Sequence, residues 1–322
     1  MHNALPYKTK QFFFVLIKLS IVVGAFYFIY NKVVNNNALS FYDFIDFSLK
    51  SNVFSTKNVI ILLVLSIFNW FFEILKWKTL VSFTQTISFH NALKQSLSTL
   101  TASLFTPNRI GEYGAKALYY KSGSRKRVML VNLISNFLQM SVTTILGIIG
   151  FVFFILTYDP DLNYYKIAKF LVFVVLGVVF LIFGIAKNRF KIKGFSLEKV
   201  KHFILEFPKK KLVKGFIFSL IRFLIFSFQF YFLLQIFKVE LSYLEAMTLI
   251  TSMYLIVSII PSIFIFDVIV KGSVAVYLFS IAGVNELIIL CIITLMWILN
   301  FVIPSLIGSY YVLRFKLPIT QD

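Results

Sequence analysis

Two stretches decide the fold of this chain, ALKQSLSTLTASLFTPNRIGEYGAK (residues 92–116) and AMTLITSMYLIVSIIPSIFIFDVIVK (residues 246–271). In each stretch an apolar run reaches a proline after fifteen positions, and an acidic residue and a lysine follow, four positions apart. We expect two hydrophobic helices, each interrupted at its proline and followed by a charged pair on one helix face. Charges beside broken hydrophobic helices are costly in lipid and tend to mark a functional pathway. Paired interruptions in two halves of a chain are typical of transporters.

The charged residues near the two prolines are the candidate substrate-binding residues, and the prolines and nearby glycines are the candidate hairpin-breaking residues. The first group is Arg109, Glu112, Lys116, Asp267 and Lys271, and the second group is Pro107, Gly111, Pro261 and Gly272. Proline removes a backbone donor and glycine permits a turn. The amides freed at the start of the next helix, beside Arg109, would bind a phosphate or a carboxylate. Alternatively, each acid and its lysine form a simple ion pair that holds the hairpin together, with Lys116 close to the cytoplasmic surface.

The composition indicates the class of protein. Hydrophobic residues make up 59% of the 322 residues and charged residues only 14%, whereas soluble domains have about 25% charged residues. The mean hydropathy of +0.86 agrees. We therefore expect an all-α integral membrane protein with a single polytopic domain over residues 1–322. Cys291 is the only cysteine and the three histidines are widely scattered, so the sequence predicts no disulfide framework, no metal site and no cofactor.

Six apolar stretches have about the length needed to cross a bilayer. They lie near residues 12–31, 58–75, 129–157, 167–186, 215–237 and 287–313. Lysines precede the first stretch but no small-residue cleavage site follows it, so we interpret it as an uncleaved anchor. With the two interrupted hairpins, the stretches predict six to eight transmembrane helices in two pseudo-repeat halves, about 1–157 and 167–313.

The net charge of +19 lies beside the predicted spans. Within the loop 187–214, lysines and arginines far outnumber Glu198 and Glu206. The positive-inside rule explains this placement without a nucleic acid as partner, and it puts this loop and both termini in the cytoplasm. The basic residues would then face the anionic inner leaflet. Apolar residues from Leu197 to Phe207 recur at helical spacing and predict either an amphipathic helix on that leaflet or a connector helix packed on other loops.

This orientation makes the two halves run in opposite directions, as an inverted repeat. Inverted repeats with broken helices near the midplane are the architecture of alternating-access carriers. The arm Gln95–Asn108 would cover only about 21 Å at 1.5 Å per residue, too little to cross, which predicts a re-entrant hairpin. The arm Ala246–Phe266 is long enough to cross, so the number of spans stays open between six and eight.

Other polar residues have structural interpretations. The first arm is rich in hydroxyl side chains, which either satisfy the opened backbone and face a polar cavity or allow close helix packing. They are Ser96, Ser98, Thr99, Thr101, Ser103 and Thr106. Glu73 is expected at the membrane interface, with Lys76 and Lys78 just beyond it. Amides inside spans are expected to join helices, and these are Asn69, Gln139, Gln229 and Asn300.

Three segments resemble a known family. Thr106–Glu112 reads TPNRIGE and resembles the TP-x-R-x-G-E signature of the lysylphosphatidylglycerol synthase transmembrane-region family, also called flippase-like membrane proteins. Leu75–Lys78 (LKWK) looks like that family's basic-Trp-basic segment. Pro261–Gly283 is similar to its second motif, which usually has a Gly-Gly-Leu-Gly-x-Arg-Glu type run. Here residues 264–272 read FIFDVIVKG, so the glycines are missing and Lys271 is the candidate to replace the arginine.

The resemblance has implications for function. Full-length synthases of this family resemble a fusion of such a membrane region to a soluble aminoacyl-transferring domain. This chain has no segment for that domain after its last predicted span, so the resemblance implies the lipid-translocating half rather than the synthase chemistry. It also implies the cytoplasmic membrane of a bacterium.

The leading hypothesis is a lipid flippase, or a carrier of lipids or polyprenyl phosphates, that holds the headgroup in a central polar cavity and is not an enzyme. Arg109 would engage the headgroup phosphate, while Glu112 and Asp267 hold the neighbouring cations or exchange protons. No Walker A motif is present, so direct ATP drive is not expected. One alternative is an intramembrane enzyme on lipid-linked substrates, although the chain lacks a paired histidine, a metal cluster and a nucleophile elbow. Another is a non-catalytic scaffold for a separate lipid synthase.

Overall fold

The computed structural model describes residues 41–104, 106, 110–160, 197–259 and 264–317, together with five helical positions between residues 16 and 27. All regular elements in these ranges are helices. They are α2 (Phe41–Lys50), α3 (Thr56–Val81), α4 (Phe89–Ser103), α5 (Gly111–Ala117), η2 (Ser122–Ser124), α6 (Arg125–Tyr158), α8 (Leu197–Glu206), α9 (Lys209–Ile236), α10 (Tyr243–Ile259), α11 (Phe264–Ile281), α12 (Glu286–Trp297), η3 (Ile298–Val302) and α13 (Ile303–Leu313). The described part of the chain confirms the all-α class.

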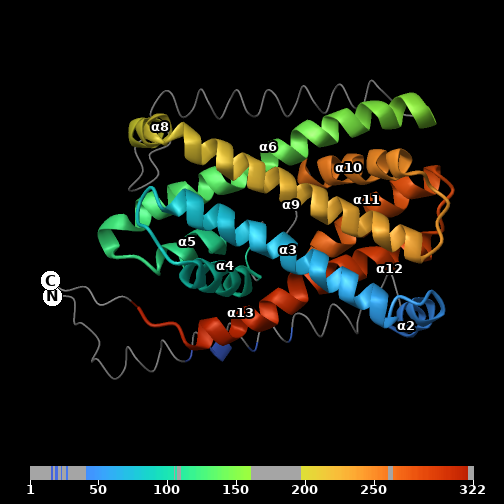
Figure 1. Ribbon diagram of the computed structural model, residues 1–322, viewed down its shortest axis with the longest axis horizontal. Coiled ribbons are helices and arrows are strands. Elements are labelled where there is room, and N and C mark those ends of the chain that lie inside the picture. Colours follow the sequence, from blue (N-terminus) through green and yellow to red (C-terminus); the bar gives the residue numbers. More distant parts are fainter. Residues whose placement is uncertain are drawn as a thin grey trace.

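Four helices in the described ranges are long and apolar enough to cross a membrane, and they run along the long axis of the molecule (Figure 1). They are Thr56–Val81, Ser122–Tyr158, Lys209–Ile236 and Glu286–Leu313. Four of the six predicted spans are thereby confirmed as long apolar helices. The predicted span 167–186 lies outside the described residues, as does most of 12–31.

Both predicted interruptions separate two helices. α4 ends before Pro107 and α5 begins at Gly111, while α10 ends before Pro261 and α11 begins after it. Gly272 lies inside α11, which continues through it. The second break is therefore at the segment around Pro261, and the expectation that Gly272 helps to break this hairpin is wrong, because a single glycine in an apolar helix interior is tolerated.

Capping residues explain where several helices begin. Ser242 and Glu245 form a capping box at α10, in which the Ser242 amide donates to Glu245 Oε2 at 2.9 Å and the Glu245 amide donates to the Ser242 hydroxyl at 3.3 Å. Ser88 caps α4 and Asn285 caps α12, each through its side-chain oxygen. At each of these helix starts a nearby side chain therefore accepts from at least one backbone N–H.

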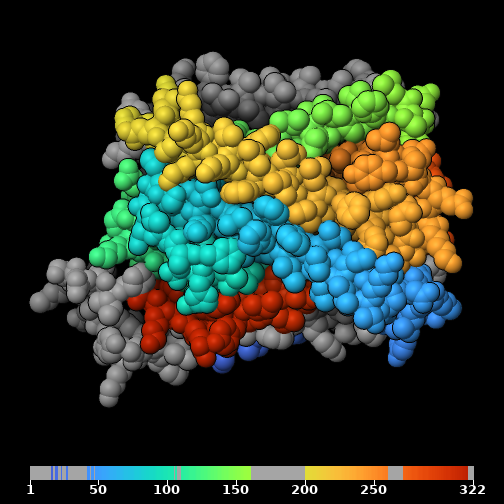
Figure 2. All heavy atoms as spheres, viewed as in Figure 1, coloured from blue at the N-terminus to red at the C-terminus, as the bar shows by residue number. Residues whose placement is uncertain are grey.

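The long helices pack in antiparallel pairs whose partners come from the two predicted halves. α3 lies beside α9 along its whole length (Figures 1 and 2), so that Leu62 is bonded to Gln229 and Ser82 to Lys211. α4 packs on α13, and α10 packs on α6. The interrupted helix of each half thus packs on the last long helix of the other half.

Glycines allow α4 and α10 to approach their partners closely. A Cβ on Gly308 of α13 would collide with a backbone carbonyl and a side chain of α4. A Cβ on Gly147 of α6 would collide with a side chain of α10 and lie 3.2 Å from a backbone carbonyl of that helix. Gly308 faces Leu97 and Thr101, and Gly147 faces Thr251 and Leu255. Counted from Ala92 and Ala246, these are the same positions in the two stretches quoted above. The Thr101 hydroxyl also donates to the carbonyl of Ser305 at 2.9 Å. Close helix packing is therefore one role of the hydroxyl-rich arm.

Two short helices, α2 and α8, precede α3 and α9 at opposite ends of the bundle (Figure 1). The predicted helix after Leu197 is confirmed as α8. Its Phe203 and Phe207 rings lie 5.4 and 4.8 Å from the ring of Phe83, which follows α3. α8 therefore packs on a neighbouring loop, as expected of a connector helix, and its position on a leaflet stays a prediction.

Candidate functional site

Glu112 and Lys116 of α5 form a buried ion pair. Their charged groups are 2.6 Å apart, and the side chains are only 7% and 1% exposed. α5 has seven residues and places the pair one turn apart on the same face. The ion pair was predicted correctly. Lys116 is covered by neighbouring helices rather than exposed, and its depth relative to the cytoplasmic surface stays a prediction.

Lys116 contacts two further helices. Its Nζ donates to Oδ1 of Asn132 on α6 at 2.8 Å, and it lies 4.1 Å from the ring centre of Trp77 on α3. The ammonium therefore gains a hydrogen bond and a cation–π contact. The indole of Trp77 donates to Oε1 of Gln95 on α4 at 2.8 Å, and the same oxygen accepts from the Tyr120 hydroxyl at 2.9 Å. Four helices thus hold Lys116 in place.

The two tyrosines after α5 stay protonated. Burial raises the pKa of Tyr120 to about 12, although its hydrogen bond to Gln95 acts in the opposite direction. Burial also raises the pKa of Tyr119, whose hydroxyl lies 2.7 Å from that of Ser98. Both phenols therefore keep their proton at neutral pH and fix the end of the hairpin to α4.

Thr106 closes the connection between α4 and α5. Its hydroxyl donates to the carbonyl of Ser103 at 2.8 Å and accepts from the amide of Gly111 at 2.9 Å. A Cβ on Gly111 would lie 2.7 Å from the Thr106 side chain. Gly111 is therefore needed for space rather than for an unusual turn, since Gly283 is the only glycine with a positive φ in the described part of the chain.

Glu73 and Lys76 of α3 form a second ion pair together with Arg222 of α9. Glu73 Oε2 lies 2.8 Å from Lys76 Nζ and 2.6 Å from Arg222 Nη1, and its side chain is 12% exposed. Antiparallel α9 places Arg222 opposite Glu73, a partner that the expectation of an interfacial Glu73 did not include, while the depth of Glu73 in the membrane stays a prediction. Arg222 was not among the predicted site residues.

Arg222 joins three helices. Its Nε donates to Oδ1 of Asn69 on α3 at 3.0 Å, and its Nη1 also donates to Oε1 of Gln139 on α6 at 3.3 Å. The other terminal nitrogen, Nη2, makes no hydrogen bond within the described residues. Since the side chain is 21% exposed, this guanidinium keeps two N–H donors for another acceptor.

The two ion pairs form one ion cluster, which we define as Glu73, Lys76, Glu112, Lys116 and Arg222. Lys116 interacts electrostatically with both Glu73 and Lys76. The ion cluster has three cations and two carboxylates, so these described residues carry one positive charge in excess. An uncompensated charge inside a membrane protein is costly, and an anionic ligand would neutralise it.

Amide side chains extend the polar interior beyond the ion cluster. Asn69 donates to Oδ1 of Asn300 at 2.8 Å, and Asn300 donates to Oε1 of Gln229 at 2.9 Å. Gln229 in turn donates to the Ser66 hydroxyl at 2.8 Å. The expectation that amides inside spans join helices is confirmed, since this series connects α3, α9 and η3.

A wide helical turn brings Asn300 into that series. Ile298–Val302 form a π-helix between α12 and α13. Pro304 has no N–H to donate to the carbonyl of Asn300. The indole of Trp70 on α3 donates to that carbonyl instead, at 3.1 Å. The neighbouring tryptophan therefore supplies the hydrogen bond that the Asn300 carbonyl lacks in this distorted part of the helix.

The structure describes less of the second stretch. Lys271 of α11 lies 5.4 Å from the ring centre of Phe301. Asp267 lies within α11, but its side chain is outside the described part, as are Pro107, Arg109 and Pro261. Whether the two charged stretches meet at one cavity therefore stays a prediction.

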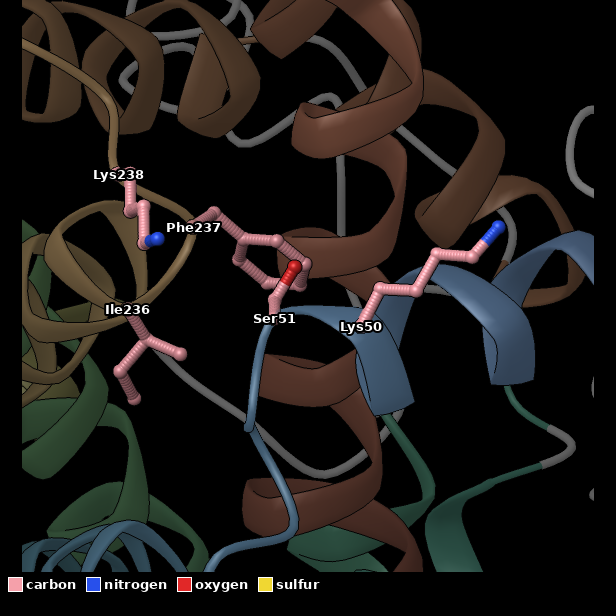
Figure 3. A pocket seen from close by; sticks show the side chains of 5 residues that line it. All are labelled: Lys50, Ser51, Ile236, Phe237 and Lys238. Carbon is pink, nitrogen blue, oxygen red and sulfur yellow. The ribbon is translucent and has the colours of Figure 1, made fainter.

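A small pocket lies at the opposite end of the bundle from the ion cluster, between the turn after α2 and the end of α9 (Figure 3). Lys50, Ser51 and residues 236–238 line it. Lys50 extends away from Phe237 and is paired with exposed Asp46 at 2.6 Å. Within the described residues, no group of His, Cys, Asp and Glu side chains could hold a metal ion. The ion cluster is therefore the strongest candidate site.

Comparison with known proteins identifies the family. The model of the family described as Lysylphosphatidylglycerol synthase TM region matches residues 15–308. No curated protein and no solved structure matches the chain. The match includes both interrupted hairpins and all residues of the ion cluster. With its four long apolar helices, the chain is an integral membrane protein and belongs to the lysylphosphatidylglycerol synthase transmembrane-region family.

Proposed function

We propose that this protein is a carrier that moves an anionic or zwitterionic lipid, or a polyprenyl phosphate, between the leaflets of a membrane. The observation that carries the proposal is the buried pair of Lys116 and Glu112 on a helix that begins at a chain interruption. Charged residues at such interruptions are rare inside membranes and mark substrate paths. Membership of a family of lipid-related membrane proteins supports the same conclusion.

The proposed mechanism assigns a role to each charged residue of the two stretches. Arg109 engages the headgroup phosphate through bidentate hydrogen bonds, which a guanidinium forms better than an ammonium. Lys116 and Lys271 assist it, and Glu112 and Asp267 hold these cations while the site is empty. We propose no covalent chemistry, so the protein acts as a transporter and not as an enzyme.

The proposed architecture is an inverted repeat with halves near 1–157 and 167–313. The packing supports it: α3 is antiparallel to α9, and each interrupted helix lies on the last long helix of the other half. The two equivalent glycine contacts give further support. In this architecture α4 and α5 form a re-entrant hairpin, since α4 has only 15 residues. The number of spans is then between six and eight.

The proposed orientation puts α8 and both termini in the cytoplasm of a bacterium, against the anionic inner leaflet. The end of the bundle that bears α8 carries a large excess of described cations: Lys78, Lys121, Arg125, Lys126, Arg127, Lys201, Lys209, Lys210, Lys211, Lys214, Arg314 and Lys316. At the other end, acids outnumber lysines: Asp43, Asp46, Asp159, Glu240, Glu245 and Glu286, with Lys50, Lys57 and Lys238. In a Cys291→Ala background, an impermeant thiol reagent should label Pro160→Cys and spare Val200→Cys. Labelling of position 200 alone would reverse the orientation.

Reconstitution in liposomes tests the transport proposal. Fluorescent lipids with several headgroups would be placed in one leaflet, and their appearance in the other would be followed by quenching from outside. Arg109→Ala and Lys116→Gln should abolish lipid movement at matched amounts of folded protein. The matched control is Lys121→Gln, which removes an exposed lysine at the same end of the bundle and should move lipid at the wild-type rate.

A double variant separates transport from structure. If Arg109 serves only as a partner of an acid, the change Arg109→Ala with Glu112→Gln should restore lipid movement, because no acid is left unpaired. The transport proposal predicts that the double variant stays inactive, because the headgroup has lost its ligand. Full rescue would contradict the assignment of Arg109. Wild-type protein that moves no lipid but converts a lipid-linked substrate would instead establish an enzyme.

A further inference from the structure

Three buried polar groups beside the ion cluster lack hydrogen-bond partners within the described part of the chain. They are the Nδ2 amide of Asn132 and the hydroxyls of Ser135 and Ser219. All three residues are 0% exposed. Buried polar groups in native proteins are nearly always paired, and lipid offers none of the hydrogen bonds that water would. Their clustering therefore requires an explanation.

The two unpaired groups on α6 lie between the cations of the ion cluster. Asn132, Ser135 and Gln139 are spaced i, i+3 and i+7 and share one face of α6. Asn132 accepts from Lys116 at 2.8 Å, and Gln139 accepts from Arg222 at 3.3 Å. Ser135 is therefore located along α6 between the contacts of Lys116 and Arg222.

The unpaired hydroxyl on α9 faces the same region. Gly215, Ser219 and Arg222 lie on one face of α9, at i, i+4 and i+7. A Cβ on Gly215 would lie 2.8 Å from Leu138 of α6 and 3.0 Å from Leu80 of α3. This face of α9 therefore points at the junction of α3 and α6, where Nη2 of Arg222 makes no hydrogen bond to any other described residue.

We propose that this junction of α3, α6 and α9 is a binding site for one phosphate group, located between Lys116 and Arg222. The excess of one positive charge in the ion cluster matches a monoanionic phosphodiester. Arg222, Lys76 and Lys116 supply charge-assisted donors, and the unpaired amide and hydroxyls supply neutral ones. In the empty state Glu73 serves as the counter-ion that the phosphate replaces at Arg222.

The inference deepens the proposed function, because it rests on that function for the source of the phosphate: the headgroup of the transported lipid. It assigns binding to α3, α6 and α9, in addition to the interrupted hairpins. Free inorganic phosphate has the same recognition chemistry, so the experiment includes both sources.

Calorimetric titration of the purified full chain in a maltoside detergent tests the site. Three probes are compared: a short-chain phosphatidylglycerol, a diacylglycerol with the same chains, and inorganic phosphate. The phosphatidylglycerol should bind and the diacylglycerol should not. Saturable binding of inorganic phosphate of similar strength would support the site with free phosphate as its ligand. Equal binding of phosphatidylglycerol and diacylglycerol would overturn the proposal.

Two serine variants provide the sharpest result. Ser135→Ala and Ser219→Ala should each weaken phosphatidylglycerol binding by roughly tenfold, because each loses a hydrogen bond to an anion. Their melting temperatures should stay the same or rise, because these hydroxyls have no hydrogen-bond partner among the residues that the structure describes. The matched control is Ser227→Ala on α9, whose buried hydroxyl already donates to the carbonyl of Phe223 at 2.8 Å. It should bind as wild type does, whereas unchanged affinity in Ser135→Ala and Ser219→Ala would refute the site.

A charge variant guards against misfolding as the cause of lost binding. Glu73→Gln removes the counter-ion and leaves Lys76 and Arg222 without it, so phosphatidylglycerol should raise the melting temperature of this variant more than that of wild type. An equal or smaller rise would count against the proposal. Binding without lipid movement in liposomes would overturn the carrier and keep the site. Lipid movement without phosphate-dependent binding would keep the carrier and overturn the site.

Discussion

The interior of this protein is built in two ways, and α9 contributes to both. Arg222 lies in the ion cluster, whereas Phe230, two turns later, lies in an apolar core. The main fully buried members of this apolar core are Phe230, Leu233, Leu234, Leu249, Ile250, Met253, Phe279, Ile289 and Ile292. Because lipid tails are as apolar as these side chains, the hydrophobic effect does not drive their burial, and close packing alone stabilises the apolar core. The ion cluster needs every partner in place, which favours a functional reason for its presence.

The largest expected effect is the loss of an acid from the ion cluster. Glu73→Leu leaves buried Lys76 and partly buried Arg222 without this counter-ion and should lower the free energy of unfolding by about 3–5 kcal/mol. Unfolding in mixed micelles by a denaturing detergent would measure it. The control is Asp46→Leu, which breaks a pair that is 59% exposed at the acid and should change stability little. Similar losses in both variants would remove the distinction between the cluster and an ordinary surface pair.

A cavity in the apolar core should affect stability alone. Leu249→Ala removes a side chain that is 0% exposed and should lower the free energy of unfolding by about 2–5 kcal/mol, from lost contacts and an unfilled cavity. Lipid movement per folded molecule and phosphatidylglycerol affinity should match wild type. Loss of lipid movement at full folding would mean that the two interiors share the function.

Smaller effects are expected where each interrupted helix packs on its partner. Gly308→Ala and Gly147→Ala each place a methyl group against the facing helix and should lower stability by about 1–3 kcal/mol. The size of the loss should be similar in both, because the contacts are equivalent. Gly123→Ala is the control, since nothing lies within 4 Å of its Cβ position. A large loss in one variant only would argue against equivalent halves.

The smallest effect is expected at the edge of the ion cluster. Tyr120→Phe removes a hydrogen bond to Gln95 and should lower stability by about 1 kcal/mol at neutral pH. The folded-state pKa of about 12 lies above the ordinary value of 10.0. The unfolded chain therefore loses this proton first, and wild type should lose stability as the pH rises from 10 toward 12. The variant should lose less over that range, and equal losses would show that Tyr120 does not titrate as described.

Local spacing made one part of the site predictable. Glu112 and Lys116 are one helical turn apart, so their pairing follows from the sequence alone. Glu73 and Arg222 are far apart in the chain, and their pairing depends on the register of α3 against α9. A signal was nevertheless present: Glu73 is the only charge in the predicted span 58–75, and Arg222 is the only charge in 215–237. Two lone opposite charges in lipid are expected to meet.

The fold was predictable to a similar degree. Length and hydropathy located the long helices, because a bilayer imposes both. The positions of Gly111 and Gly272 show where such reasoning stops. One provides space for Thr106 and the other continues a helix, and only the neighbours in three dimensions decide between these roles. Which helices pack together likewise depended on contacts that no spacing rule contains.

The π-helix at Ile298–Val302 has a consequence for the faces of the last long helix. One extra residue in a turn rotates everything after it by about 100° relative to an ideal α-helix. Asn300 can therefore point toward α3 and α9 while Gly308, two turns later, meets α4. Deleting one residue from this turn would put the two faces out of phase. The last long helix can therefore contact α3 and α9 with one face and α4 with another, which an uninterrupted α-helix could not do.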